Sequence, residues 1–220
     1  MKAIKILTIL LLAGIFTFPA YSQKADESSY MMIMVRHKKA FKMARTKADF
    51  QQLAEDFARI AESESDKWHP AYYAALCYIN MSFVSDDADE RDSYLDEAQK
   101  YIDKALEIYP DESELLVLQG LLYQGRIQVD PAGRGMTYSS KAAMAFNHAL
   151  QVNPDNPRAY YLMGLNTLHT PESYGGGAEA ACSYFKTAAE KFRRDIPENV
   201  LSPTWGGERN QKLLAQTCGN

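Results

Sequence analysis

The sequence predicts an all-α fold, a right-handed stack of antiparallel helical hairpins with a C-terminal capping helix. One observation is a recurring triplet: an alanine, a bulky apolar residue four positions on, and a second alanine three further. Another is that large residues upstream of these triplets, Tyr72, Leu116 and Tyr160, follow one another at steps of 44 residues. A fixed period of this kind indicates stacked hairpins rather than one closed core. The triplets are Ala98, Ile102 and Ala105; Ala142, Phe146 and Ala149; and Ala181, Phe185 and Ala188.

The triplets have a packing explanation. Residues three and four positions apart share one face of a helix, and alanines on that face let a neighbouring helix approach closely. The bulky residue between them then fills the groove of the partner helix. Polar and proline-containing segments after Pro110 and around Pro154 separate the periodic stretches, as expected where one helix ends and the next is capped.

The elements follow in order along the chain. We expect a leader at 1–22, a divergent first hairpin at 23–66, three clear repeats at 67–195, and a capping helix and tail at 196–220. The first hairpin is predicted because a step of 44 residues back from Ala98, Ile102 and Ala105 reaches Ala54, Ala58 and Ala61. The capping helix is predicted at 208–217, with Leu213 and Leu214 turned inward.

The repeats resemble the tetratricopeptide repeat (TPR) family. The first helix of that family's unit carries large and small anchors, as at Leu116, Gly120 and Tyr123, and a proline closes the unit, as at Pro154. The family's unit has about 34 residues, so these units are about ten residues longer. We expect the surplus to form long intra-repeat loops at 85–91 and 129–139.

The resemblance also implies a concave surface lined by the first helix of each hairpin. We expect this surface to bind a protein or peptide, with no cofactor and no metal. Tyr73 and Cys77 stand where the carboxylate-clamping TPR proteins need lysine and asparagine, which argues against that mode of binding. The inward side chains implied by the resemblance are Tyr73, Cys77, Asn80, Glu114, Val117, Leu121, Gln124, Arg158, Tyr161, Leu165 and His169.

The N-terminus predicts export. Lys2 and Lys5 precede an apolar run at 6–18 that is too short to cross a bilayer, and small residues follow it, as in a secretory signal peptide cleaved after Ser22. Removal of residues 1–22 takes away two lysines and leaves 22 basic against 28 acidic side chains, a net charge of −6. An acidic chain without a basic stripe argues against nucleic-acid binding. We expect a periplasmic or secreted protein with no membrane span in the mature chain.

The candidate chemistry is sparse. The four histidines lie in separate segments without nearby paired ligands, which argues against a metal site. The glycine run 175–177 lacks the lysine and hydroxyl residue of a phosphate loop, so we expect a turn there. Asp130, Arg134 and Tyr138, near Arg126, are expected to form an internal ion pair or part of a binding face.

Three cysteines in an exported chain leave one unpaired. A capping helix antiparallel to the preceding helix brings Cys218 beside Cys182, so we expect a Cys182–Cys218 disulfide with Cys77 left as a buried thiol. Three reduced cysteines are the alternative.

Three classes of function stay open. We expect a non-catalytic exported scaffold that binds a protein or peptide in its groove. A small-molecule or lipid carrier serving a transporter is the first alternative, favoured if the groove closes over an apolar cavity of ligand size. An enzyme is the second, favoured if titratable groups from 129–139 and Tyr174 converge in a cleft.

Overall fold

The computed structural model describes residues 27–219, and the expected leader at 1–22 lies outside them. This part of the chain contains nine α-helices, one short 3-10 helix and no strand, which confirms the all-α prediction. None of its helices combines the length and the apolar composition needed to cross a bilayer. The helices are α1 (Glu27–Met43), α2 (Lys47–Ser63), α3 (Trp68–Val84), α4 (Ala88–Ile108), α5 (Ser113–Val129), α6 (Pro131–Val152), α7 (Pro157–Leu168), α8 (Ala178–Phe192) and α9 (Gly207–Cys218).

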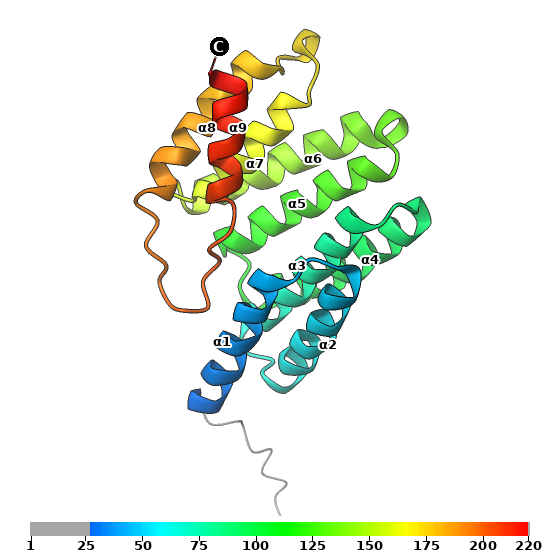
Figure 1. Cartoon of the computed structure of the whole chain (residues 1–220), viewed down its shortest axis with the longest axis vertical. Helices are drawn as coiled ribbons and strands as arrows, with labels where there is room; N and C mark the ends of the chain where they lie inside the picture. The colour runs from blue at the N-terminus through cyan, green and yellow to red at the C-terminus, as the bar shows by residue number, and fades with distance from the viewer. Residues whose placement is uncertain (1–26, 220) are drawn as a thin grey trace, which may run out of the picture.

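The helices form a stack of hairpins, as the 44-residue period predicts (Figure 1). The pairs α3–α4, α5–α6 and α7–α8 are each closely packed, and α2 packs on α3. By contrast, α1 makes only limited contact with α2, and α9 lies against α8 at the far end of the stack.

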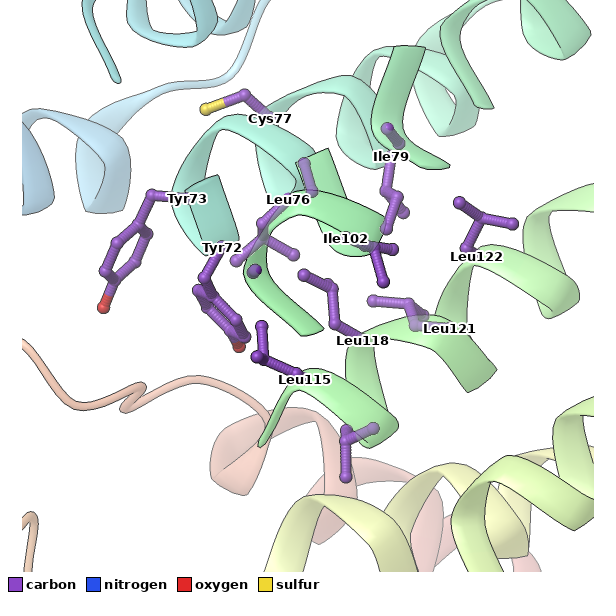
Figure 2. Close-up of a cluster of buried hydrophobic side chains, with 14 of the residues drawn as sticks. Tyr72, Tyr73, Leu76, Cys77, Ile79, Ile102, Leu115, Leu118, Leu121 and Leu122 are labelled. Carbon is purple, nitrogen blue, oxygen red and sulfur yellow. The ribbon is translucent and has the colours of Figure 1, made fainter. Parts of the chain in front are cut away.

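The core follows the repeated triplets. All nine of their residues are completely buried, and Ala54 and Ala61 of α2 are buried as well. Figure 2 shows how the layers meet: Tyr72 and Leu76 of α3 and Ile102 of α4 face leucines of α5 such as Leu118. Helix α5 has little exposed surface because it lies between the hairpin before it and the hairpin after it.

In the first two clear repeats the extra length is almost entirely helical, so the prediction of long loops at 85–91 and 129–139 is wrong. The carboxylate of Asp87 accepts a hydrogen bond from the backbone N–H of Glu90 (2.8 Å), and α4 begins at Ala88. The carboxylate of Asp130 accepts from the N–H of Gly133 (3.0 Å), and Pro131 occupies the first turn of α6. An aspartate cap followed by proline is a strong helix start, so α6 begins directly after α5 although Gly133 and Gly135 lie in its first turns.

The long irregular connections lie nearer the C-terminus. Between α7 and α8 the chain makes a single 3-10 turn, Glu172–Tyr174, and then turns at Gly175 and Gly177 with φ values of 81° and 95°. These values favour glycine because it has no Cβ, and they agree with the turn expected at 175–177. The second connection, residues 193–206, is called the strap below; it leaves α8 and extends toward the N-terminal half of the stack before α9 begins (Figure 1).

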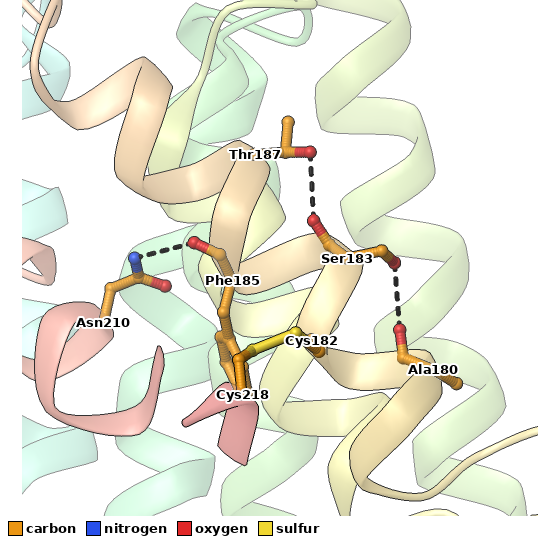
Figure 3. The surroundings of a disulfide bond; sticks show 7 residues. All are labelled: Ala180, Cys182, Ser183, Phe185, Thr187, Asn210 and Cys218. Atoms are coloured by element: carbon orange, nitrogen blue, oxygen red, sulfur yellow. Dashed lines mark hydrogen bonds between the residues drawn. A yellow bond between two sulfur atoms is a disulfide. The ribbon is translucent and has the colours of Figure 1, made fainter. Parts of the chain in front are cut away.

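The structure joins Cys182 of α8 to Cys218 of α9, with Cα atoms 5.5 Å apart, as predicted (Figure 3). The side-chain amide of Asn210 donates to the carbonyl oxygen of Phe185 (3.0 Å), a second tie between the same helices. Leu213 of α9 is buried. Cys77 is a free buried thiol, also as expected.

Candidate ligand-binding cavity between the first helices and the strap

A cavity of about 640 Å³ lies between α3, α5, α7 and the C-terminal segment; we call it the main cavity. Its volume is in the range of small-molecule and cofactor sites, about 300–1,000 Å³. The lining residues are Phe41, Leu76, Asn80, Phe83, Leu121, Gln124, Ile127, Gln128, Tyr161, Leu162, Leu165, Asn166, His169, Trp205 and Arg209.

Helical periodicity brings the side chains of each wall together. On α5, Leu121, Gln124 and Gln128 stand three and four positions apart, and on α7, Tyr161 and Leu165 are four apart. Residues at these spacings share one face of a helix. The same rule places Leu76, Asn80 and Phe83 of α3 on the opposite wall.

The walls are mainly apolar, and their amide side chains are largely engaged within the protein. Asn80 donates to the carbonyl oxygen of Leu76 (2.7 Å), Gln124 donates to that of Leu162 (2.9 Å), and Asn166 donates to that of Ser139 (3.2 Å). Oε1 of Gln124 is buried and accepts no hydrogen bond within the described part of the chain. The main cavity therefore offers an apolar space with few polar contacts, which suits a largely apolar ligand.

The strap closes one side of this space and is held by side chains from the N-terminal half. Nζ of Lys38 in α1 donates to the carbonyl oxygens of Val200 and Ser202 (2.7 and 2.5 Å). The hydroxyl of Tyr73 in α3 donates to the carbonyl oxygen of Leu201 (2.8 Å). Three consecutive strap carbonyls are thus fixed by α1 and α3.

At its C-terminal end the strap delivers Trp205 to the main cavity. The indole N–H of Trp205 donates to the hydroxyl of Tyr72 (2.8 Å), which orients the ring. Gly206, with a φ of 101°, then turns the chain into α9, and α9 places Arg209 at the same cavity. Arg209 is the one arginine or lysine among the lining residues of the main cavity, and no carboxylate lines it.

A separate polar cavity of about 380 Å³ surrounds Arg158 of α7 and Glu114 of α5. Nε of Arg158 contacts both carboxylate oxygens of Glu114 at 2.9 Å, and the side-chain amide of Asn156 donates to the same carboxylate (2.8 Å). Nη1 of Arg158 lies 3.1 Å from Asp195 of the strap. Burial raises the pKa of Glu114 to about 7, and the charge and hydrogen bonds of Arg158 oppose that shift. This network ties α5, α7 and the strap together.

The predicted groove residues divide among these environments. Asn80, Leu121, Gln124, Tyr161, Leu165 and His169 line the main cavity. Tyr73 instead anchors the strap, and Glu114 and Arg158 form the buried pair of the polar cavity.

Val117 and Cys77 do not face a groove, contrary to expectation, because both are completely buried. Helices α3 and α5 each pack against neighbours on more than one side, so some side chains of their inner faces go into helix contacts.

Sequence reasoning missed the lining residues that come from outside the three central hairpins: Phe41 of α1, Trp205 of the strap and Arg209 of α9. The signal for Trp205 was present, since a tryptophan followed by two glycines in a short polar tail is a large apolar side chain that needs a place to bury. The sequence pattern of the tail by itself predicts only a cap for the stack.

The residues considered for catalysis do not converge. Arg134 pairs with Asp92 of α4 (2.7 Å) and not with Asp130, and Tyr138 lies near Lys141. Tyr174 is exposed. Residues 27–219 contain no group of three or more histidine, cysteine, aspartate or glutamate side chains able to hold a metal ion.

Comparison with known proteins finds similar solved structures that cover most of the chain. The sequence matches no protein-family model and no curated protein sequence. Among solved structures, the TPR protein TTC0263 from Thermus thermophilus superposes with a TM-score of 0.54 at 16% identity, over 85% of this chain and 91% of that one. This likeness concerns the fold alone.

The HusA haemophore from Porphyromonas gingivalis superposes with a TM-score of 0.80 at 30% sequence identity. The alignment covers 89% of this chain and 96% of the haemophore, so it extends over nearly all of the helical stack. At this identity and coverage, the chain belongs to the family of the HusA haemophore.

Proposed function

We propose that this protein is a non-catalytic carrier that binds a tetrapyrrole, haem or a metal-free porphyrin, in the main cavity. The observation that carries the proposal is a ligand-sized apolar cavity in a chain that belongs to the family of a haemophore. A porphyrin is a broad, flat, largely apolar ring. Walls of leucine, phenylalanine and isoleucine with Tyr161 and Trp205 suit such a ring through apolar burial and aromatic stacking.

The lining residues also offer a group for the iron of haem. Histidine and tyrosine side chains are ordinary axial ligands of haem iron, and His169 and Tyr161 both line the main cavity. His169 lies at the C-terminal end of α7 and is exposed, whereas Tyr161 is buried. The burial of the phenol raises the pKa of Tyr161, which favours its neutral form, so we assign the iron contact to His169.

Peptide binding in an open groove, the expectation from the TPR resemblance, has less support. Trp205 and Arg209 approach the first helices from the C-terminal segment and confine the space to a volume suited to a small molecule. An extended peptide needs a groove that stays open along several hairpins. The small-molecule alternative is therefore the better supported one.

We further propose that the protein acts outside the cytoplasm, in the periplasm or beyond. The Cys182–Cys218 disulfide supports this, because such bonds persist in oxidising compartments. The test is N-terminal sequencing of the protein recovered from cell fractions. A chain that begins near Gln23 in an exported fraction agrees with the proposal, and an intact Met1 on a cytoplasmic protein contradicts it.

The binding proposal is tested by titrating the purified mature protein with haem and, separately, with protoporphyrin IX. Binding is followed by the porphyrin absorption band and by quenching of tryptophan fluorescence. The variant Leu165→Glu places a carboxylate in the main cavity and should weaken both ligands at least about tenfold, since an unpaired charge in an apolar site is costly.

Met144→Glu is the matched control. Met144 is 71% exposed on α6 and does not line the main cavity, so the same charge change should leave the affinity unchanged. Absence of binding by the wild type, or equal affinity of wild type and Leu165→Glu, contradicts the proposed function.

A further inference from the structure

A second cavity of about 460 Å³ adjoins the main cavity and shares Phe41, Asn80 and Trp205 with it. It lies between the C-terminal half of α1, helix α3 and the start of α9. Its remaining lining residues are Lys38, Lys42, Ala44, Arg45, Phe50, Tyr73, Thr204 and Glu208.

The side chains that line the second cavity carry a net positive charge, whereas the whole chain carries a net negative charge. The chain has a net charge of −4, yet the second cavity has three cationic side chains, Lys38, Lys42 and Arg45, against one carboxylate, Glu208. Arg209 adds a further cation in the main cavity. An acidic protein that gathers cations at one place on its surface is equipped there for an anionic ligand.

The positive charge of Lys38 is not neutralised by a carboxylate of the described residues. The side chain is only 8% exposed, and no carboxylate of the described residues lies within ion-pair distance of its Nζ. Its Nζ donates to two strap carbonyls, which leaves one of the three ammonium protons without a partner. Burial, together with the positive charges of Lys42 and Arg158, lowers the pKa of Lys38 to about 8.

Two more cationic side chains have no ion-pair partner among the described residues. The side chains of Lys42 and Arg209 make no hydrogen bond and no ion pair in residues 27–219, and they line the two cavities that meet at Trp205. Arg45 uses Nη1 to donate to the carbonyl oxygens of Lys42 and Ala44 (2.9 and 2.6 Å), which holds its guanidinium at the end of α1. The remaining N–H groups of a guanidinium so placed can still bind a carboxylate.

We propose that the second cavity is a carboxylate subsite: it binds the acid groups of an amphiphilic ligand whose apolar body lies in the main cavity. The inference rests on the proposed function and deepens it, because it defines the orientation of the porphyrin. The ring edge that bears the two carboxylates points past Trp205 toward Lys42 and Arg45. The opposite, apolar edge lies between α5 and α7.

The test compares protoporphyrin IX, a dicarboxylate, with its dimethyl ester, which has the same ring and no charge. The wild type should bind the diacid about tenfold more tightly than the diester, and the preference should shrink as salt rises. The double variant Lys42→Gln with Arg45→Gln should bind the diacid about tenfold more weakly than the wild type does. Its affinity for the diester should be unchanged. Lys39→Gln, an exposed lysine of the same helix that lines neither cavity, should change nothing.

The outcomes separate this inference from the proposed function. If neither porphyrin binds the wild type, the proposed function is wrong and the subsite falls with it. If both bind equally well, or if the double variant keeps the full preference for the diacid, the cavity binds porphyrin but the carboxylate subsite is wrong. Thermal melting of each variant checks that it is folded, and should the double variant melt early, the single variant Lys42→Gln decides the question.

Discussion

Phe146 of α6 occupies the space that a side chain at Gly120 of α5 would take. A Cβ added to Gly120 would lie 2.2 Å from Cε1 of Phe146, which is far inside van der Waals contact. The same relationship recurs one hairpin later, where a Cβ on Gly164 of α7 would lie 2.7 Å from the ring of Phe185. In the second and third triplets, the glycines therefore let the phenylalanine reach the backbone of the partner helix.

Gly120→Ala should lower the free energy of unfolding by about 1 to 3 kcal/mol, because the methyl group has to displace a completely buried ring. The matched control is Gly135→Ala in α6, where an added Cβ meets nothing within 4 Å. That control should stabilise the protein by about 0.5 to 1 kcal/mol through helix propensity alone. Urea unfolding of both variants measures the difference, and equal effects at the two positions would refute the packing argument.

Replacing both Cys182 and Cys218 with serine should lower the free energy of unfolding by about 3 to 4 kcal/mol. The bond closes a segment of 36 residues, and the chain-entropy model gives a value of this order for such a loop. The measurement is urea unfolding of wild type and double variant with and without reductant. Reductant should destabilise the wild type and leave the double variant unchanged; an insensitive wild type would show that the bond contributes nothing.

Lys38 should make the stability of the wild type depend on alkaline pH. Its pKa falls from 10.5 to about 8 on folding, so between these values the unfolded chain binds the proton and the folded chain does not. Stability rises with pH wherever the unfolded state binds more protons. Relative to Lys38→Met, which does not titrate, the wild type should gain about 1 to 3 kcal/mol as pH rises from 8 to 10.5.

Comparison with the Lys38→Met variant removes the contribution of the tyrosines, which titrate in both proteins. Chemical unfolding at several pH values across this window gives the difference directly. A difference that stays constant, or that falls as pH rises, would mean that Lys38 remains fully charged in the folded protein.

His169→Ala should change the absorption spectrum of the haem complex and leave the affinity for metal-free protoporphyrin within about twofold, because only the iron needs an axial ligand. His148→Ala is the control: His148 is exposed on α6 and does not line the main cavity. Identical haem spectra for wild type and His169→Ala would assign the iron contact to another group.

The repeat architecture could be predicted because each hairpin packs in the same way, so equivalent buried residues recur at a fixed period in the sequence. Each alanine of the triplets is completely buried in a helix that packs on its neighbours, so the period in the sequence is the period of the stack. The helix boundaries in 85–91 and 129–139 were harder. Gly133 and Gly135 weaken a helix locally, yet capping by Asp130 and packing against α5 are enough to extend α6 through them.

The cavity-lining residues could be predicted from the sequence only on the first helices of the hairpins. Spacing along α5 and α7 identifies Leu121, Gln124, Tyr161 and Leu165 without knowledge of the rest of the fold. The position of Trp205 depends on where the strap lies, and that is fixed by contacts such as Lys38 to Ser202, 164 residues apart in the chain. No local pattern encodes a contact of that kind.

The strap limits how the number of repeats in this chain can change. Open repeat arrays evolve readily by gain or loss of a unit, since each unit touches only its neighbours. Here the C-terminal segment must reach back to Lys38 and Tyr73, and the number of hairpins sets the distance that it has to span. Duplication or deletion of a single hairpin would break that connection. The copy number of the repeat is therefore fixed by a loop that belongs to none of the repeats.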